Sequence, residues 1–335
     1  MISVIIPTRN RANLLNDTLK SILNQSISLS EFEIIVVDNG SNDNTAEIIN
    51  KYKDQLTNLR KIFAPEPGLH IGRHAGMKAA KGDILVFADD DIEALPTWLI
   101  SIREAFKDPE VAMVGGNNYP LFLQSPPDWL NQMWKRKTIR GNKFVSELSI
   151  CEFSPNTKNI SPSSILGCNF PIRKSVLIES GGFHPDSFPE NLKKFSGDGE
   201  TYVSKYVHNK GLKCIFRHGA SIFHKVIPQR MTKEYFYKRS FEQGIRNSYT
   251  ILRDDFAKNK NSCNKKNFLN LMTINFRDLL TNFKKLLINR ILASSMERDI
   301  TEIKLKGLKE GFDYHQKLYN EELELRNWVH KEKYY

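Results

Sequence analysis

The first ninety residues alternate between short apolar runs and amphipathic stretches, and this alternation limits the chain to few folds. The apolar runs occupy residues 3–7, 33–37, 60–64 and 83–87. Stretches with helical periodicity lie between them, at 11–25, 44–53 and 72–80. Continuously apolar strands that alternate with helices are typical of a parallel sheet. We therefore predict an α/β fold, with a mostly parallel sheet and helices on both of its faces.

Polar segments follow three of these predicted strands. They are PTRNR (7–11), DNGSND (38–43) and ADDD (88–91). Ligands bind beyond the carboxyl ends of the strands in such sheets, so we expect the three segments to meet at one rim. The glycine-rich GxGxxG and GxxxxGK[ST] motifs are absent from the sequence. The phosphates of a nucleotide at this rim would therefore be bound by side chains other than those of a glycine-rich loop.

The run Asp89–Asp90–Asp91 could bind phosphates through a divalent cation. Carboxylates at alternate positions of an extended segment point the same way, so Asp89 and Asp91 can share one divalent cation. Mg²⁺ or Mn²⁺ is typically held by one or two carboxylates together with substrate phosphates, and it would neutralise a diphosphate leaving group. The alternative is a helix cap, because a helical pattern follows at 96–106 and aspartate favours helix starts.

The order of three segments resembles the family 2 glycosyltransferases of bacterial type. The segments are SVIIPTRNRANLL (3–15), IIVVDNGSNDNT (34–45) and GLHIGRHAGMKAAKGDILVFADDDI (68–92), and the resemblance covers about residues 1–225. It implies a GT-A, Rossmann-like fold and an inverting transfer from a UDP- or GDP-sugar. The acceptor would be a hydroxyl of a glycan or a lipid-linked glycan, as in polysaccharide and cell-envelope biosynthesis.

The resemblance also implies roles for individual residues. Those expected to bind the nucleotide sugar are Pro7, Thr8, Arg9, Arg11, Asp38, Arg73, Asp89, Asp90 and Asn169. The expected ligands of Mn²⁺ or Mg²⁺ are Asp91, Asp89 and His224, although a lone histidine is more often structural. Trp129 either contacts the acceptor or packs in the core. His74 stands where the family more often has asparagine, which leaves its role open.

The catalytic base is expected in the segment KFSGDGETYV (194–203). The family usually has a Glu-Asp pair about eleven residues before a glycine, and Glu200 lies eleven residues before Gly211. Here a glycine separates Asp198 from Glu200, and we favour Glu200 over Asp198. The alternative is a helix start with Asp198 as its cap and Glu200 in its first turn. One residue can serve both purposes.

The predicted catalytic domain spans residues 1–227, and a helical, basic region spans 228–335. The net charge is +11, of which +9 falls at residues 225–335. An amphipathic stripe at 276–291 carries lysine and arginine beside it, so it either binds an anionic membrane surface or packs on the catalytic domain. Residues 306–329 resemble a helical tail of some bacterial transferases. No nucleic-acid-binding motif is recognisable.

The remaining composition indicates a cytoplasmic protein, with peripheral attachment to the inner face of the membrane as the second expectation. The four cysteines are scattered, and no apolar run reaches the length of a membrane span. Two rival functions remain open. A nucleotidyltransferase would want a glycine-rich loop after the first strand, and PTRNRANLL has no glycine. A carbohydrate-binding protein without catalysis would not need the ADDD and GDGET segments.

Overall fold

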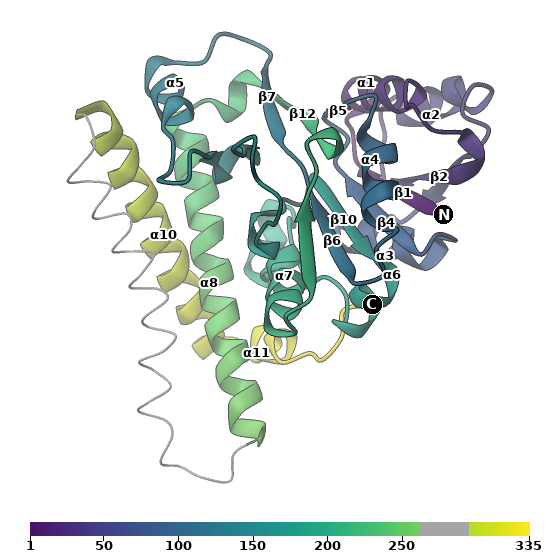
Figure 1. The fold of residues 1–335 in the computed structure, drawn as a ribbon. Coiled ribbons are helices and arrows are strands. Elements are labelled where there is room, and N and C mark those ends of the chain that lie inside the picture. The colour runs from purple at the N-terminus through teal and green to yellow at the C-terminus, as the bar shows by residue number, and fades with distance from the viewer. Residues whose placement is uncertain (262–294) are drawn as a thin grey trace.

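A computed structural model describes residues 1–261 and 295–335, and a seven-stranded sheet lies at its centre (Figure 1). The strand order is β11-β6-β10-β4-β1-β2-β3. The bounds are β1 (Ile2–Thr8), β2 (Phe32–Asp38), β3 (Leu59–Phe63), β4 (Ile84–Ala88), β6 (Val111–Gly115), β10 (Asn169–Arg173) and β11 (Lys213–Phe216). Only β10 pairs antiparallel with its neighbours in this sheet. The predicted, mostly parallel sheet is confirmed.

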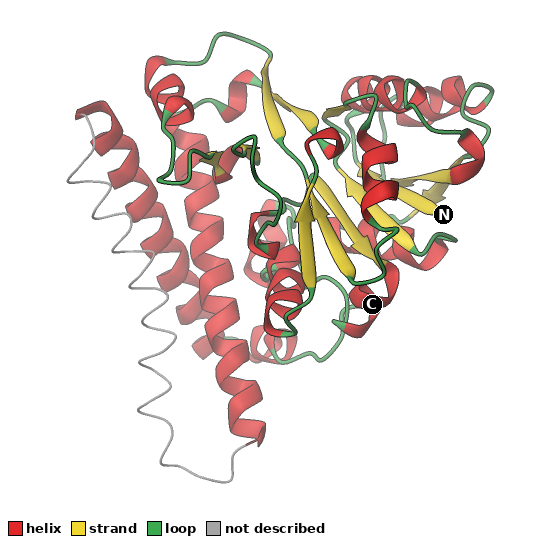
Figure 2. Ribbon diagram, in the orientation of Figure 1, coloured by secondary structure: helices red, strands yellow, loops and turns green. Residues whose placement is uncertain are grey.

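Helices cover both faces of this sheet (Figure 2). Side chains of α1 (Ala12–Leu23), α2 (Thr45–Lys53) and α4 (Trp98–Ala105) belong to one core cluster. Side chains of α3 (Leu69–Ala79), α6 (Lys174–Glu179) and α7 (Gly199–Asn209) belong to the other. The two clusters divide the residues of each central strand alternately, as the two-residue repeat of a strand requires.

A second, five-stranded sheet extends the fold beyond the end of β4. Its strand order is β5-β12-β7-β9-β8. The bounds are β5 (Ile92–Ala94), β7 (Asn118–Phe122), β8 (Lys143–Val145), β9 (Ile150–Glu152) and β12 (Ile222–Val226). β5 follows the aspartate run directly, and His224 of β12 pairs with Ile92 of β5. This pairing brings His224 next to the aspartates, although the two are far apart in the sequence.

The described part of the C-terminal region is helical and packs on the preceding part of the chain. It contains α8 (Lys233–Asn261), α10 (Ser295–Glu321) and α11 (Leu323–Val329), while the shorter α5 (Asp128–Lys135) lies near α8 (Figure 1). Among the described residues, Tyr335 contacts the His74 ring, with centroids 5.0 Å apart. Trp328 Nε1 donates to the Phe195 carbonyl at 2.8 Å. The amphipathic stripe predicted at 276–291 lies outside the described residues.

Helices α8 and α10 run in the same direction at very close approach. Lys233 faces Asp299 near the two starts, and Ser248 meets His315 further along both helices. Glycines make the approach feasible. A Cβ on Gly311 would lie 1.9 Å from the Phe241 carbonyl oxygen, well inside any allowed contact.

Candidate active site

A cavity of about 430 Å³ opens at the carboxyl ends of β1 and β4, as the strand-end rule predicts. We call it the strand-end cavity. It is lined by Pro7, Thr8, Arg9, Arg11, Asn39, Gly68, Leu69, Asp89, Asp90, Ser187, Phe188, Pro189 and Arg230. Six of these residues were expected at the nucleotide sugar, namely Pro7, Thr8, Arg9, Arg11, Asp89 and Asp90. The segment that follows β1 and the aspartate run that follows β4 therefore do meet.

Asp90 points toward the segment that follows β1. Thr8 Oγ1 donates to Asp90 Oδ2 at 2.7 Å, and Arg11 Nη1 lies 2.6 Å from Oδ1. The backbone carbonyl of Asp90 accepts from Thr18 Oγ1 on α1 at 2.9 Å. Burial raises the pKa of Asp90 above its ordinary value, although Arg11 opposes the shift. The carboxylate of Asp90 thus fixes the loop after β1 against the end of β4.

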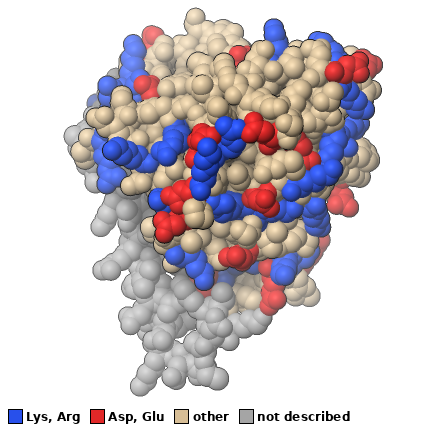
Figure 3. All heavy atoms as spheres, turned by 45° about the vertical axis from the view of Figure 1, so that its right-hand side comes forward, with Lys and Arg blue, Asp and Glu red and all other residues tan. Residues whose placement is uncertain are grey.

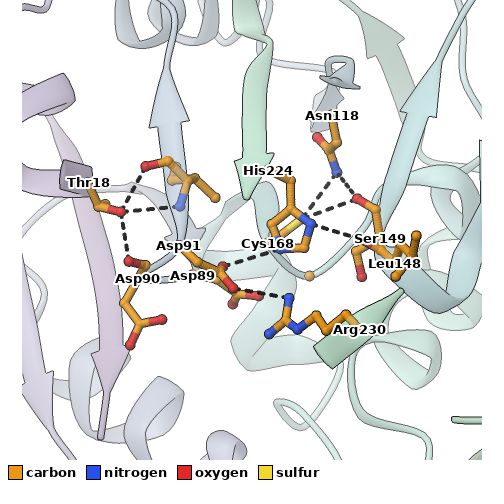
Figure 4. A network of polar contacts seen from close by, with 12 residues as sticks. Thr18, Asp89, Asp90, Asp91, Asn118, Leu148, Ser149, Cys168, His224 and Arg230 are labelled. Atoms are coloured by element: carbon orange, nitrogen blue, oxygen red, sulfur yellow. Dashed lines mark hydrogen bonds and ion pairs between the residues drawn. The ribbon is translucent and has the colours of Figure 1, made fainter. Parts of the chain in front are cut away.

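Asp91 is 1% exposed and divides its two oxygens between different partners (Figure 4). Its Oδ2 faces two guanidinium groups, Arg11 at 2.5 Å and Arg230 at 3.1 Å. Its Oδ1 lies 3.2 Å from His224 Nε2. Burial alone would raise the pKa of Asp91, but His224, Arg11 and Arg230 together hold it well below its ordinary value.

His224 presents a nitrogen atom to this site. Its Nδ1 lies 2.8 Å from the Leu148 carbonyl, so in the neutral ring Nδ1 carries the proton and Nε2 carries the lone pair. Neither Nε2 nor Asp91 Oδ1 makes a hydrogen bond to any described residue, although both are buried. With the ring neutral, these are two acceptor atoms 3.2 Å apart, and a bound cation would satisfy both. A protonated ring would instead pair directly with Asp91.

A second carboxylate completes this arrangement. Asp89, Cys168 and His224 each offer one ligand atom, and the three atoms lie within 4.8 Å of one another. Burial, assisted by the charges of Asp89 and Asp91, raises the pKa of the Cys168 thiol well above its ordinary value. Cys168 therefore stays protonated and accepts a hydrogen bond from Asn118 at 3.2 Å. Oxygen from Asp89 and Asp91 with nitrogen from His224 is a donor set that suits Mn²⁺ or Mg²⁺.

Arg73 connects the aspartate run to Glu200. The guanidinium of Arg73 is buried, and it lies 3.7 Å from Asp89 and 3.3 Å from Glu200. It also donates to the Gly167 carbonyl at 3.1 Å. Burial works against its charged form, yet the carboxylates of Glu200, Asp89 and Asp186 raise the pKa of Arg73. The side chain of Glu200 remains 28% exposed, so it can meet a ligand.

Asp198 occupies a different environment from Glu200, although both lie at the start of α7. Asp198 Oδ1 lies 2.7 Å from His184 Nδ1, and Oδ2 accepts from Thr250 Oγ1 of α8 at 2.9 Å. Burial would raise the pKa of Asp198, but the His184 and Thr250 contacts lower it. Its side chain makes no helix-capping hydrogen bond. Both carboxylate oxygens are committed to holding α7, α8 and the segment before α7 together.

Of the two polar residues at the end of β2, Asp38 and Asn39, only Asn39 lines the strand-end cavity. Asp38 is buried, lies 2.9 Å from Lys61 Nζ and accepts from the Ser41 amide at 2.9 Å. Burial would raise the pKa of Asp38, but these hydrogen bonds lower it. Asn39, which the sequence reasoning missed, lines the strand-end cavity and donates to the Glu66 carbonyl at 2.7 Å.

Three residues that the sequence analysis considered for the site instead contact other parts of the protein. Asn169 accepts from Trp98 Nε1 at 3.0 Å and donates to Asn118 and the Ala220 carbonyl, so its amide is committed away from the cavity lining. Trp129 is buried, with its ring on Phe236 at 5.0 Å, which is the core-packing alternative. His74 accepts from the Phe183 amide at 3.0 Å, and this contact ties α3 to the loop after α6.

Arg230 and Phe188 are two further cavity residues that sequence reasoning did not find. Arg230 lies six residues after His224, just beyond the end of β12, so the strand-end rule applied to β12 would have found it. Phe188 belongs to an irregular segment before α7 and carries no such signal. Both reach the strand-end cavity through contacts between segments that are distant in the sequence.

This combination of a mostly parallel sheet, a second sheet and an aspartate run at the end of a central strand defines a GT-A fold. The same fold is found in the mannosyltransferase PcManGT from Pyrobaculum calidifontis, solved with GDP-Man and Mn²⁺. The TM-score is 0.55 at 19% identity, over 96% of this chain and 88% of that one. The chain belongs to glycosyl transferase family 2, whose model matches residues 3–181.

Named relatives match only part of the chain. A validoxylamine A glucosyltransferase of Streptomyces hygroscopicus is 34% identical over 116 residues, which are 34% of this chain and 27% of that protein. A chondroitin synthase of Pasteurella multocida is 31% identical over 210 residues, which are 54% of this chain and 21% of that protein. The matched segments thus span about a quarter of each relative. Among the described residues, no helix is long and apolar enough to cross a membrane.

Proposed function

We propose that the protein transfers a sugar, with inversion, from a nucleoside-diphosphate sugar to a hydroxyl group of a glycan or lipid-linked glycan. One observation supports this most strongly. Asp89, Asp91 and His224 converge beside the strand-end cavity, and Arg73 links Asp89 to the partly exposed Glu200. We therefore propose that the diphosphate binds on the Asp89 side of Arg73 and that the carboxylate base lies on its other side.

The donor is proposed to lie in the strand-end cavity with its diphosphate toward the aspartate run. Arg9, Arg11 and Arg230 supply positive charge there, and Arg230 is already oriented by Asp91. The planar guanidinium group of arginine can donate two parallel hydrogen bonds to phosphate oxygens. The nucleobase of the donor is proposed to lie near the end of β2, where Asp38 and Asn39 offer polar groups. A carboxylate there would accept a ring N–H of uracil or guanine.

A divalent cation is proposed to be held by Asp91, Asp89 and His224. Asp91 Oδ1 and His224 Nε2 are buried without a hydrogen bond, and an Asp89 oxygen lies within 4.8 Å of the His224 nitrogen. The bound cation would offset the negative charge of the leaving diphosphate. PcManGT, which shares the fold, was solved in complex with Mn²⁺, and this supports the choice of metal. Asp90 is proposed to organise the loop after β1 instead, since Arg11 and Thr8 occupy its carboxylate.

Glu200 is proposed as the general base. It accepts the proton of the acceptor hydroxyl while the hydroxyl oxygen attacks the anomeric carbon, and the nucleoside diphosphate departs from the opposite face. Arg73 holds the carboxylate in place before the acceptor arrives. Asp198 is proposed as a structural residue because His184 and Thr250 take both of its oxygens.

A location at the inner face of the cell membrane is a further part of this proposal. Of the +9 excess at residues 225–335, +5 lies at 262–294, outside the described residues. On the face shown in Figure 3, basic and acidic side chains are interspersed. The attraction to anionic lipid is therefore proposed to come chiefly from the undescribed part of the region.

A donor panel tests the proposed reaction. UDP- and GDP-sugars are added with Mn²⁺, and the thermal unfolding midpoint and the release of nucleoside diphosphate are measured. Stabilisation by one nucleotide class, together with release of its diphosphate, is expected. Release of pyrophosphate from a nucleoside triphosphate would instead identify a nucleotidyltransferase. Binding of saccharides without any turnover would identify a protein that only binds carbohydrate.

A further inference from the structure

A second cavity, of about 420 Å³, adjoins the strand-end cavity. Phe188 lines both cavities, so the two share a wall. The second cavity lies between the segment that precedes α7 and helix α11. We call it the aromatic cavity. The C-terminal region thus builds one side of a hollow next to the proposed donor site.

The floor of the aromatic cavity consists of three partly exposed rings. Phe188 and Phe195 flank Trp328, with ring centroids 6.1 Å and 5.4 Å from that of Trp328. The Trp328 indole is fixed because its Nε1 donates to the Phe195 carbonyl at 2.8 Å. A ring that is locked and still partly exposed offers a rigid apolar face.

The rim of the aromatic cavity is polar. Glu324, Asn327 and Lys331 of α11 and the residues after it are exposed there. The Lys331 ammonium lies 5.4 Å from the Trp328 ring centroid. An aromatic floor with a few hydrogen-bonding groups around it matches a pyranose ring, which has an apolar face and a girdle of hydroxyl groups.

The position of the aromatic cavity relates it to the proposed base. The segment with Phe188 and Phe195 leads directly into α7, whose first turn contains Glu200. Phe188 also contacts His70 of α3, with ring centroids 5.2 Å apart, and α3 carries Arg73 one turn further along. A chain of sugars that rests in this cavity therefore lies beside both elements that hold Arg73 and Glu200.

We propose that the aromatic cavity is an acceptor subsite that binds one sugar ring of the acceptor glycan, stacked on Trp328. This proposal rests on the proposed glycosyl transfer and names where its second substrate is held. The sugar is preferred over a hydrocarbon chain because the rim carries three polar side chains. Trp328, rather than the buried Trp129, is then the tryptophan that contacts the acceptor.

A protein of residues 1–335 is labelled with 5-fluorotryptophan to test this subsite. The chain has four tryptophans, and its ¹⁹F spectrum is assigned by replacing each in turn. The saccharide probes are chitotetraose, cellotetraose, maltotetraose and a chondroitin tetrasaccharide, and farnesyl phosphate is the isoprenoid probe. At least one saccharide is expected to shift the Trp328 signal while leaving that of buried Trp98 unchanged.

Substitutions separate stacking from a structural contribution. Trp328→Leu is expected to weaken binding of that saccharide by about tenfold, the loss of roughly one aromatic contact. Trp328→Phe keeps an aromatic face and should restore most of the affinity. Trp134→Leu is the matched control, because Trp134 is partly exposed but lies in another cluster. Stabilisation of Trp328→Leu by UDP or GDP with Mn²⁺ should equal that of the wild type.

Three results would overturn the subsite. They are the absence of a Trp328 shift with every saccharide, an unchanged saccharide affinity in Trp328→Leu, and a shift with farnesyl phosphate alone. The proposed function has a separate readout. If neither UDP nor GDP stabilises the wild-type protein, the donor site is refuted, whereas normal nucleotide binding with no saccharide response refutes only the acceptor subsite.

Discussion

Replacing Glu200 by glutamine separates the proposed base from its neighbour Asp198. Glutamine keeps the length of the side chain and an oxygen for Arg73, which now lies 3.3 Å from Glu200 Oε2. It cannot accept a proton at neutral pH. Arg73 would still contact Asp89 at 3.7 Å and the Gly167 carbonyl at 3.1 Å, so the arginine should stay in place.

The expected magnitudes follow from these contacts. Loss of general-base catalysis typically lowers the rate by about 10²–10⁴-fold, which is about 3–5 kcal/mol of barrier. Donor affinity should change by at most about fivefold, because a partly exposed ion pair contributes roughly 0–1 kcal/mol. The unfolding midpoint should barely move, since Glu200 remains 28% exposed.

Asp198→Asn is the matched variant at the same end of α7. Its buried carboxylate interacts with His184 and Thr250, and a charge-assisted contact of this kind is worth about 1.5–3 kcal/mol. We expect a lower unfolding midpoint and a milder loss of turnover. Single-turnover transfer from a radiolabelled donor, together with thermal unfolding, measures both quantities for both variants.

The opposite pattern would refute the assignment. If Asp198→Asn abolishes transfer and Glu200→Gln retains most of it, the base is Asp198. If both variants transfer at the wild-type rate, the segment that precedes Gly211 does not supply the base at all.

Four further predictions concern the metal, the helix pair, acid stability and the membrane. His224→Ala should weaken Mn²⁺ binding at least tenfold, measured by electron paramagnetic resonance, and equal affinity would remove His224 from the ligand set. Gly311→Ala should destabilise the protein by about 1–3 kcal/mol in denaturant unfolding, because its Cβ would meet the Phe241 carbonyl at 1.9 Å, whereas Lys309→Ala on the exposed face should change little. Burial lowers the pKa of His315 to about 4, whereas an unfolded histidine titrates near 6.5. The stability that the neutral, buried ring supports is therefore complete above about pH 6.5. It falls by up to about 3 kcal/mol as the pH drops toward 4, because protons then favour the unfolded chain. His315→Gln should flatten that part of the stability curve, and an unchanged slope would refute this. Vesicles of anionic lipid should sediment the protein at low salt and neutral vesicles should not, and indifference to lipid charge would refute the membrane proposal.

The rim of the sheet was predictable because strand periodicity fixes where each strand ends. The segments after β1 and β4 therefore met as expected, with Asp90 against Thr8 and Arg11. The direction in which each side chain points was harder to predict from the sequence. The spacing of Asp89 and Asp91 predicted only that they could share a cation. That both lie near His224 follows from the pairing of β12 with β5.

The sequence favoured Glu200 over Asp198 only through its spacing to Gly211, since both residues lie at one helix end. Their difference comes from His184 and Thr250, which the fold brings to Asp198 alone. Trp129 presents the same difficulty. Its segment is compatible with exposure or burial, and only the position of Phe236 on α8 decides it.

The contribution of the C-terminal region was the least predictable feature. Arg230 lies beyond the predicted boundary at 227 and yet lines the strand-end cavity. Trp328 comes from a helix near the end of the chain and meets Phe195. Such contacts depend on how the last helices pack back on the rest of the fold, which hydrophobic periodicity alone does not specify.

Titration of a nucleoside diphosphate tests the central claim most directly. UDP and GDP are titrated by calorimetry into the wild type and Asp91→Asn, each with and without Mn²⁺. We expect tight binding of one nucleotide to the wild type with Mn²⁺, and at least tenfold weaker binding when either the metal or the Asp91 carboxylate is missing. Equal affinity in all four cases would contradict a metal-assisted diphosphate site at the end of β4.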